Sequence, residues 1–480
     1  MATPTFLADL GAVVDRPGLL LPSDDLSRFE REWRGRFQSL ALGVARPATP
    51  EMLADVVACC QRHRVGMVPQ GGNTGLVGGA VARGDRRELI ISLERMRRVR
   101  ELNLESACIS VEAGCTLGET SRAAAEQGLR LPLVLASGDS ATIGGVLATN
   151  AGGNETIRFG NARQMVLGLE AVLADGRIWR GLSPLRKDNA GYSLAQLLIG
   201  SEGTLGIITA ATLALKPAPQ QREVAWLAVP SPAAALELLT RLRQSLGESI
   251  TAFELMPALA VDFVLAHVSG ARCPVNSDSP WHVLIECDVA IPGQWLREAV
   301  LEGLAACSDL LSQDGVLAQS QKQREGFWLI RESISDAQKV GGVSLKHDIS
   351  LPLDRIPAFI DQTLSVLETL LPGLRPCVFG HLGDGNLHFN LTQPEDMSAE
   401  AFKGREAEVN EVVFKGVIDA GGSIAAEHGI GLLRREWLKK CLDNTALETM
   451  QGIKRALDPL QLMNPGKVFG EDYSSSAGTI

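Results

Sequence analysis

Apolar residues in the N-terminal half of the chain repeat alternately with the periods of helices and strands. Thr49-Pro50 is a typical helix start, with a hydroxyl side chain at the N-cap and proline at the first helical position. The apolar positions that follow have the i, i+3, i+4, i+7 spacing of one helix face and are Leu53, Val56, Val57 and Cys60. We therefore predict a helix from Pro50 that ends at Gly66.

Short apolar runs after this helix predict several strands. A strand beginning at Met67 leads into a glycine-rich loop, and further strands are predicted at 89–93 and 108–113. Thr116 and Glu119 form a capping box, which predicts a second helix ending at Gly128. Asp175-Gly176 between apolar runs predicts a hairpin turn.

The second half of the chain has a different pattern, and the proline-containing stretch 216–221 is the predicted boundary. Strands at 224–229 and 281–290 alternate with helices at 232–246 and 294–311, and a further helix is expected at 398–420. This order predicts an α+β domain with an antiparallel sheet covered by helices on one face. We divide the chain into an N-terminal segment 1–39, a first domain 40–218, a second domain 219–470 and a tail 471–480.

Charge and composition narrow the classes of function. The 480 residues carry a formal net charge of −10 without a basic block, which argues against nucleic acid or an anionic membrane as partner. No apolar run reaches the roughly 18 residues of a membrane span, and no signal peptide is recognised at the N-terminus. The nine cysteines include no C-x-x-C pair, which fits a reducing compartment, so we expect a cytoplasmic protein.

Three glycine-rich loops follow apolar runs in the first domain, at 69–79, 137–153 and 200–209. Consecutive glycines allow backbone N–H groups to approach an anion such as pyrophosphate closely. Any one of these loops taken alone is more simply a tight turn. The chain has neither a G-x-G-x-x-G motif after a strand nor a G-x-x-x-x-G-K-[ST] motif, so a Rossmann or P-loop nucleotide site is not supported.

Residues 40–218 resemble the flavin domain of the vanillyl-alcohol-oxidase/p-cresol-methylhydroxylase superfamily. The string Gly200-Ser201-Glu202-Gly203-Thr204-Leu205-Gly206-Ile207-Ile208-Thr209 is the most specific part of the resemblance. It implies a two-lobed FAD-binding domain, with the pyrophosphate at 70–76 and the isoalloxazine near the second loop and Ile207. The implied FAD contacts are Pro69, Gln70, Gly71, Gly72, Asn73, Thr74, Gly75, Leu76, Ser137, Asp139, Thr142, Gly144, Gly145, Asn150, Gly152, Gly153, Gly203, Ile207, Ile208 and Asn464. The first two loops lack the histidine or cysteine that tethers flavin in covalent members, so noncovalent FAD is expected.

Two of the seven histidines flank a predicted turn in the second domain. If Leu382 pairs with Leu387 across Gly383-Asp384-Gly385-Asn386, His381 lies directly opposite His388. Opposed residues have Cβ atoms about 4.5–5.5 Å apart, close enough to share one ion. Adding Glu427 gives a two-histidine, one-carboxylate site with open positions, as catalytic metals use. The alternative is a hairpin with two surface histidines.

Two cations near this motif are candidates for binding carboxylates. Arg331 and Ser335 are four residues apart in a predicted helix and share one face. Strand alternation in 343–348 directs Lys346 and His347 to opposite faces, and His347 is predicted to be a structural or a surface histidine. Arg331 can bind a carboxylate in a bidentate manner, although a solvated arginine is the simpler interpretation of such a residue alone.

Residues 220–470 resemble the C-terminal region of FAD-linked 2-hydroxy-acid dehydrogenases, and of the D-2-hydroxyglutarate dehydrogenases in particular. The resemblance rests on 186–192, on 381–388 and on Glu427-His428-Gly429. It implies metal ligands at His381, His388 and Glu427. It implies substrate contacts at Arg331, Ser335, Lys346, Asn390 and His428, with Ser335 standing where the family commonly has threonine. The segment 464–467 also matches and is expected to return to the flavin.

The resemblance implies an enzyme that oxidises a D-2-hydroxy acid, with D-2-hydroxyglutarate as the first choice and D-malate as the second. Hydride passes from C2 to flavin N5, His428 acts as general base, and one divalent metal, expected to be zinc, holds the substrate. Electrons then pass to an electron-transfer flavoprotein or a quinone, and a homodimer is expected. The alternatives are a D-lactate dehydrogenase of the same fold, an oxygen-using oxidase and a noncatalytic flavin- or metal-binding protein.

Overall fold

The computed structural model describes residues 4–276 and 279–470, and the chain forms two compact units. Unit 1 contains residues 1–153, 161–218 and 427–480, and unit 2 contains 154–160 and 219–426. The segment 427–470, which the sequence division assigns to the second domain, is thus part of unit 1. The predicted tail 471–480 lies outside the described residues. In the part of the chain that is described, no helix has the length and apolar character that crossing a membrane requires.

Unit 1 contains three sheets in its described part. In the first, β2, β4 and β3 are parallel and β1 is antiparallel to β2; the second is antiparallel, in the order β5-β6-β10-β8-β9; the third pairs β7 with β11. The strands are β1 (Leu19–Leu20), β2 (Val44–Ala45), β3 (Gly66–Gln70), β4 (Glu88–Ser92), β5 (Val99–Asn103), β6 (Cys108–Glu112), β7 (Leu129–Arg130), β8 (Val166–Leu173), β9 (Ile178–Gly181), β10 (Gly206–Ala214) and β11 (Lys216–Pro217).

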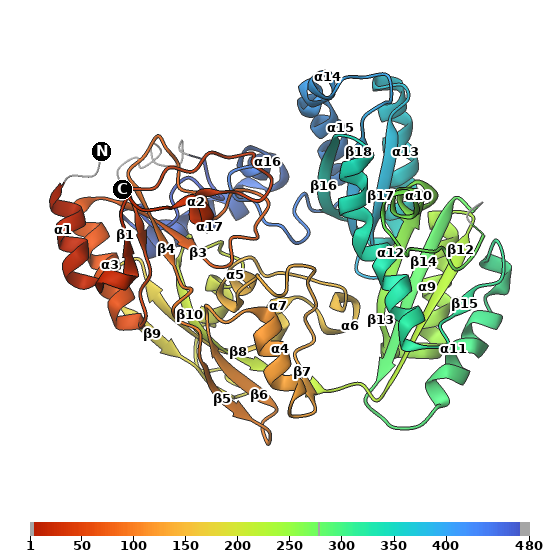
Figure 1. Ribbon diagram of the computed structural model, residues 1–480, viewed down its shortest axis with the longest axis horizontal. Helices are drawn as coiled ribbons and strands as arrows, with labels where there is room; N and C mark the ends of the chain where they lie inside the picture. Colours follow the sequence, from red (N-terminus) through yellow and green to blue (C-terminus); the bar gives the residue numbers. More distant parts are fainter. Residues whose placement is uncertain (1–3, 277–278, 471–480) are drawn as a thin grey trace. The chain divides into compact units, whose positions relative to one another are not determined.

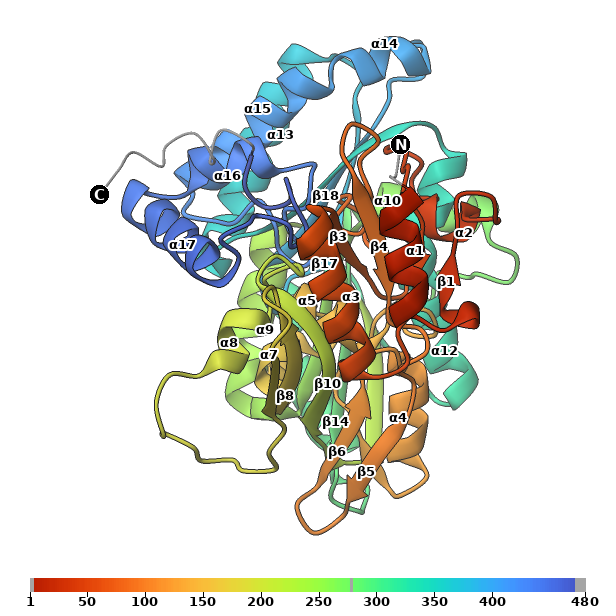
Figure 2. The same cartoon turned by 90° about the vertical axis from the view of Figure 1, so that its left-hand side faces the viewer.

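The helices of unit 1 are mostly short. They are α1 (Pro4–Val13), α2 (Ser27–Glu30), α3 (Pro50–His63), α4 (Leu117–Ala125), α5 (Ile143–Ala148), α7 (Ala162–Met165), α8 (Leu194–Leu198), α16 (Arg435–Cys441) and α17 (Asn444–Leu457). Helix α3 begins as predicted, because Thr49 accepts a hydrogen bond from the N–H of Met52, and its predicted apolar stripe is buried. The capping box of α4 is also confirmed. Figure 2 shows the long loop between β9 and α8 extending away from the second sheet.

The C-terminal segment adds to the edge of the first sheet. Met463 forms a parallel bridge with Met67 of β3. The N–H of Met67 donates to the carbonyl of Leu462 (2.7 Å), and the N–H of Asn464 donates to that of Met67 (2.7 Å). The chain therefore leaves unit 1 after β11 and returns to it after residue 426, as the expected return of the C-terminal segment requires.

Unit 2 is built on a seven-stranded antiparallel sheet in the order β15-β12-β14-β13-β17-β18-β16 (Figure 1). The strands are β12 (Gln221–Val229), β13 (Ile250–Pro257), β14 (Trp281–Val289), β15 (Val316–Leu317), β16 (Ser344–Ser350), β17 (Arg375–His381) and β18 (Asn386–Thr392). The helices are α6 (Thr156–Phe159), α9 (Pro232–Leu246), α10 (Ala258–His267), α11 (Trp295–Ala305), α12 (Gln321–Val340), α13 (Ile356–Leu370), α14 (Ala399–Gly404) and α15 (Glu406–Asp419). The antiparallel sheet is confirmed, while the helix expected at 398–420 is divided into α14 and α15.

The expectation that helices cover only one face of this sheet is wrong. Helix α12 lies on one face, where the indole N–H of Trp328 donates to Glu286 of β14 (2.7 Å). Helix α11 lies on the other face, where Arg297 pairs with Glu223 of β12 (2.7 Å). Nearly every position of the central strands is buried, so both faces need a covering layer.

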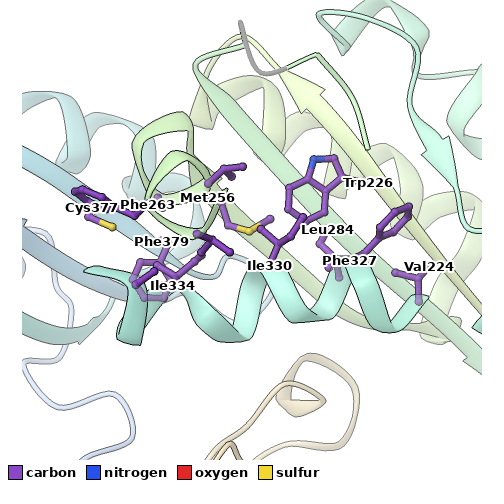
Figure 3. Close-up of a cluster of buried hydrophobic side chains, with 14 of the residues drawn as sticks. Val224, Trp226, Met256, Phe263, Leu284, Phe327, Ile330, Ile334, Cys377 and Phe379 are labelled. Carbon is purple, nitrogen blue, oxygen red and sulfur yellow. The ribbon is translucent and has the colours of Figure 1, made fainter. Parts of the chain in front are cut away.

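The core beneath α12 extends along most of the sheet (Figure 3). Phe327, Ile330 and Ile334 of α12 pack with Trp226, Met256, Leu284, Cys377 and Phe379 from β12, β13, β14 and β17. All these side chains are at most 5% exposed, so helix and sheet are firmly held together. The same face of α12 also carries the buried polar side chains of Arg331 and Gln338, which this core supports.

Candidate functional site

The first two glycine-rich loops meet in unit 1 so closely that two positions require glycine. A Cβ on Gly72 would lie 1.8 Å from the carbonyl oxygen of Ser140, and one on Gly71 would lie 2.3 Å from Thr142 Oγ1. A side chain at either position would push the loops apart. The close approach of the two loops thus depends on the absence of side chains at these two glycines.

This junction has the donors that a phosphate needs. Within residues 4–276 and 279–470, the backbone N–H groups of Gly71 and Gly72 donate to no protein acceptor, and the buried Oγ1 of Thr142 has no hydrogen-bond partner. Thr142 is also the N-cap of α5, and its side chain makes no capping hydrogen bond. An unpaired buried hydroxyl such as that of Thr142 is rare unless a ligand completes it. The junction fits the pyrophosphate of FAD.

The third loop contacts the other end of this region. Gly203 has a φ of +69°, and a Cβ there would lie 3.1 Å from Pro69. Asn464 donates through Nδ2 to the carbonyls of Gly79 (2.9 Å) and Glu202 (2.7 Å), while its buried Oδ1 accepts nothing in the described structure. Asn464 therefore joins the C-terminal segment to two flavin loops and keeps one acceptor available.

The remaining predicted flavin residues divide into buried supports and exposed positions. Gln70 donates to the carbonyls of Phe29 (2.8 Å) and Ala80 (3.1 Å), which fixes the start of the first loop. Asn150 has a φ of +50° and accepts from the N–H of Arg163 (3.0 Å). Asp139 is exposed and pairs with Arg122 (3.3 Å). These residues shape the loops rather than line the junction of Gly71 and Thr142.

Glu202, in the third loop, holds the segment that carries Glu427 and His428. Its half-buried carboxylate accepts from the N–H groups of Ile430 (2.7 Å) and Gly431 (2.8 Å). Burial raises the pKa of Glu202, although both N–H groups and Arg434 favour the charged form. Glu202 was not among the predicted site residues, despite lying within the quoted flavin motif. It fixes the predicted general base relative to the flavin loops inside unit 1.

The histidine pair of unit 2 lies on one sheet face, but not in the predicted register. Phe379, not His381, is directly opposite His388, so the pairing of Leu382 with Leu387 is wrong by two residues. The N–H groups of Asp384 and Gly385 both donate to the carbonyl of His381, and the four-residue turn between β17 and β18 is 382–385, one position earlier than predicted. The two histidines are diagonal neighbours, with ring centroids 5.7 Å apart.

Glu254 of β13 connects His381 to Arg331. It lies directly opposite His381, and its Oε1 is 2.7 Å from His381 Nδ1, while its Oε2 accepts from Arg331 Nε at 2.7 Å. Burial disfavours both charged groups, but their attraction dominates, so the pKa of Glu254 falls to about 2 and that of His381 rises to about 9. Sequence reasoning missed Glu254, although a charged residue in a buried apolar strand was the available signal.

Arg331 presents a donor with no partner. Its side chain is almost completely buried beside the ring of Phe379 (5.0 Å from Cζ to the ring centroid). No acceptor within residues 4–276 and 279–470 bonds its buried Nη2. One turn further along α12, the carbonyl of Ser335 accepts from Lys346 Nζ at 3.5 Å. The predicted cations thus lie on adjoining parts of one covered sheet face.

Asn390 lies directly opposite Lys346 in the β16–β18 pair. Its Nδ2 donates to Oε1 of the fully buried Gln338 (3.0 Å), and Gln338 donates to Thr392 (2.9 Å). Gln338 is seven residues after Arg331, on the same face of α12, and sequence reasoning did not single it out. His347 points to the other sheet face, where it bonds the Phe389 carbonyl (2.9 Å), as expected for a structural histidine.

A carboxylate also faces the second histidine. Asp348 is directly opposite His388, with 3.9 Å between Asp348 Oδ1 and His388 Nδ1. Two imidazoles and nearby carboxylates are a donor set that suits a divalent metal such as zinc. Another acidic group of unit 2, Glu155, Glu286 and Asp288, is already neutralised in part, because Arg158 pairs with Asp288 (2.8 Å). The histidine face is therefore the better candidate metal centre.

Comparison with known proteins agrees with this architecture. The model of the FAD linked oxidases, C-terminal domain, matches residues 218–468, and that of the FAD binding domain matches residues 41–181. The chain is 37% identical to the D-2-hydroxyglutarate dehydrogenase of Xanthomonas citri pv. viticola over 98% of each chain. The chain belongs to the family of FAD-linked oxidases that contains the D-2-hydroxyglutarate dehydrogenases. It is also 37% identical to the mitochondrial D-2-hydroxyglutarate dehydrogenase of Bos taurus, over 96% of this chain and 83% of that one.

Solved structures support the fold. p-Cresol methylhydroxylase superposes with a TM-score of 0.74 at 17% identity, covering 98% of this chain and 97% of that one. Alkyldihydroxyacetonephosphate synthase gives 0.71 at 18% identity, covering 97% and 85%. These neighbours confirm the expected architecture of a vanillyl-alcohol-oxidase-type flavoprotein. The predicted class, an FAD-linked oxidoreductase, is confirmed with the family.

Proposed function

We propose that the protein oxidises D-2-hydroxyglutarate, and D-malate as a second substrate, to the 2-oxo acid, using noncovalent FAD and one divalent metal. The observation that carries the proposal is the buried Nη2 of Arg331, which has no partner in the described structure. Arg331 shares Glu254 with His381, whose ring neighbours that of His388. An unpaired guanidinium donor in a buried position is best completed by an anion such as a carboxylate. The relatives named above are dehydrogenases of such an acid.

The chain's own residues have separable roles in this proposal. His381, His388 and Glu427 hold the metal, which when bound lowers the pKa of a substrate hydroxyl. Arg331, with Lys346, Asn390 and the Ser335 hydroxyl, binds carboxylate oxygens of the substrate.

Proton removal falls to one residue. His428 takes the hydroxyl proton, and its segment is kept in place by the hydrogen bonds of Glu202 to Ile430 and Gly431. The glycine-rich loops would hold FAD, which would supply the acceptor for the hydride from C2. We further propose a cytoplasmic homodimer that passes electrons to an electron-transfer flavoprotein or a quinone.

Anaerobic flavin bleaching tests the proposed function directly. The purified protein is mixed without oxygen with D-2-hydroxyglutarate, its L enantiomer, D-malate or D-lactate, and the flavin absorbance is recorded. Bleaching by the D-2-hydroxy diacids supports the proposal. A flavin that no hydroxy acid reduces would instead indicate a noncatalytic binding protein.

A diacid should be preferred to D-lactate. If one substrate carboxylate binds the metal, the two cations Arg331 and Lys346 provide more positive charge than a monoacid requires. A charge-assisted contact with a second carboxylate adds about 1.5–3 kcal/mol to the free energy of binding, or roughly 10- to 150-fold in affinity. Arg331→Ala should therefore lower kcat/KM for D-2-hydroxyglutarate far more than for D-lactate. Arg297→Ala, which removes an arginine from the opposite sheet face, is the control. Equal or better use of D-lactate by the native enzyme would favour a lactate dehydrogenase.

Flavin binding should be noncovalent and sensitive to one methyl group. Acid precipitation is expected to leave FAD in the supernatant, and yellow protein in the pellet would contradict this. Gly72→Ala should reduce the FAD content severalfold, because its Cβ would lie 1.8 Å from the Ser140 carbonyl. Gly452→Ala lies in α17 of the same unit, where the added Cβ would be 4.0 Å from Arg455 Nη2, and it should retain FAD. Equal flavin-to-protein ratios in both variants would place FAD elsewhere.

A further inference from the structure

We infer that Glu254 is a positioning residue that fixes the candidate metal ligand His381 and the candidate substrate residue Arg331 at the same time. The inference rests on the proposed function, which assigns His381 and Arg331 their roles but gives Glu254 none. Its two carboxylate oxygens bond one partner each, at 2.7 Å. Nothing in the family match or in the motifs quoted above singles out Glu254.

The location of Glu254 makes its charge costly unless both contacts form. The side chain is 0% exposed and stands between Phe253 and Leu255 in a strand whose neighbours are almost all buried. An isolated buried carboxylate costs several kcal/mol, and an apolar residue would serve the core as well. Two charge-assisted contacts compensate this cost. We therefore interpret Glu254 as a residue that orients two side chains, not as one that stabilises the core.

The contact with Glu254 determines which nitrogen of His381 is available. An ionised carboxylate only accepts hydrogen bonds, so Nδ1 of His381 must carry the hydrogen. In the neutral ring the lone pair is then on Nε2, at the other edge of the imidazole, which is the form that ligates a metal. His388 lies on the same sheet face, with its ring centroid 5.7 Å away. Glu254 therefore selects the ligating tautomer and holds the ring orientation.

The contact with Arg331 has a matching effect on the anion site. Because Glu254 takes Nε, the guanidinium is held in one orientation, with Phe379 as a flat support 5.0 Å from Cζ. The buried Nη2 is left as the donor without a partner in the described structure. A single carboxylate in β13 thus sets the geometry of a cation on α12 and of an imidazole on β17. Loss of Glu254 should weaken metal and substrate binding together.

Glu254→Gln is the sharpest test because it keeps the shape and changes only donors and acceptors. A glutamine offers one acceptor and one donor to two partners that both donate, so one contact must be lost or His381 must change tautomer. We expect metal affinity, measured by competition with a chelator and metal analysis, to fall about 10- to 100-fold. We expect the affinity for the 2-oxo acid product, titrated by the flavin absorbance change, to fall at least about 10-fold.

Glu286→Gln is the matched control. Glu286 is a buried carboxylate of the neighbouring strand β14, and it accepts from Trp328 of the same helix α12 at 2.7 Å. The Glu286→Gln variant should keep native affinity for the metal and for the 2-oxo acid. If Glu254→Gln matches this control in both affinities while remaining folded, Glu254 is merely structural and the inference is overturned.

A second variant covers the case in which Glu254→Gln does not fold. Glu254→Asp keeps the acceptor-only chemistry and the charge, but is shorter by one methylene, so metal and oxo-acid affinities should both fall at least about fivefold. Unchanged affinities in Glu254→Asp would equally overturn the inference. Failure of the proposed function itself would appear in the native protein, as no bound metal or no flavin reduction, and would remove the basis of both proposals.

Discussion

His428→Ala is expected to slow reduction of the flavin by about 10²-fold or more, while substrate affinity changes much less. A general base stabilises the transition state for proton removal, so its loss falls on the limiting rate rather than on binding. Anaerobic rapid mixing over a range of D-2-hydroxyglutarate concentrations separates the two quantities. The limiting reduction rate should fall and the apparent dissociation constant should remain within a few-fold of the native value.

The main chain around His428 should survive this substitution. The N–H groups of Ile430 and Gly431 bond Glu202, and those of Leu432 and Leu433 bond the carbonyl of Val77. None of these contacts uses the imidazole. His267→Ala, at an exposed position near the end of α10, is the matched control and should be kinetically native. An unchanged limiting rate with weaker binding would make His428 a substrate-binding residue instead.

Features encoded within a few residues were predictable from sequence. The N-cap of α3 and the capping box of α4 depend on side chains three positions from the groups they bond, and both are present. The role of the glycine-rich loops in binding FAD was expected only through a family resemblance. The reason that Gly72 must be glycine, the carbonyl of Ser140, lies 68 positions away and is visible only in the folded chain.

Strand register and layer arrangement were not predictable in the same way. The turn after His381 closes through two N–H groups bonded to one carbonyl, and the apolar pattern is equally compatible with a four-residue turn that begins one residue later. Because a shift of two residues keeps every side chain on its face, the pattern still placed both histidines together. The covering of both sheet faces depends on α12, whose apolar stripe indicates a buried face but not which side of the sheet buries it.

The residues that sequence reasoning missed act through partners distant in the chain. Glu254 bonds Arg331 and His381, which are 77 and 127 residues away, and Gln338 bonds Asn390, which is 52 residues away. Glu202 bonds Ile430 across 228 residues. A buried polar residue in an apolar segment signals that some partner exists, but its identity follows only from the fold.

His388→Ala is expected to remove the metal and abolish turnover while leaving FAD bound. Residues in the second shell of a metal alone contribute about 10- to 100-fold to affinity, so loss of a ligand should cost more than that. FAD should remain because the glycine-rich loops lie in unit 1, whereas His388 is in β18 of unit 2. Metal analysis, the flavin spectrum and turnover of D-2-hydroxyglutarate measure the three effects. Chelation of the native protein should reproduce the loss of metal and turnover with FAD retained. Added zinc should restore activity to the chelated native protein but not to His388→Ala.

His347→Ala separates the metal site from general damage to the sheet. His347 pairs with Phe389, the neighbour of His388, but its ring lies on the opposite face and bonds the Phe389 carbonyl (2.9 Å) and Asn410 (2.8 Å). Its loss should lower the free energy of unfolding by about 1–3 kcal/mol, because buried partners are left unpaired. The metal content should stay near one ion per chain. Equal metal loss in the two variants would mean that the sheet, not the imidazole of His388, determines metal binding, and full activity of His388→Ala would eliminate this metal site.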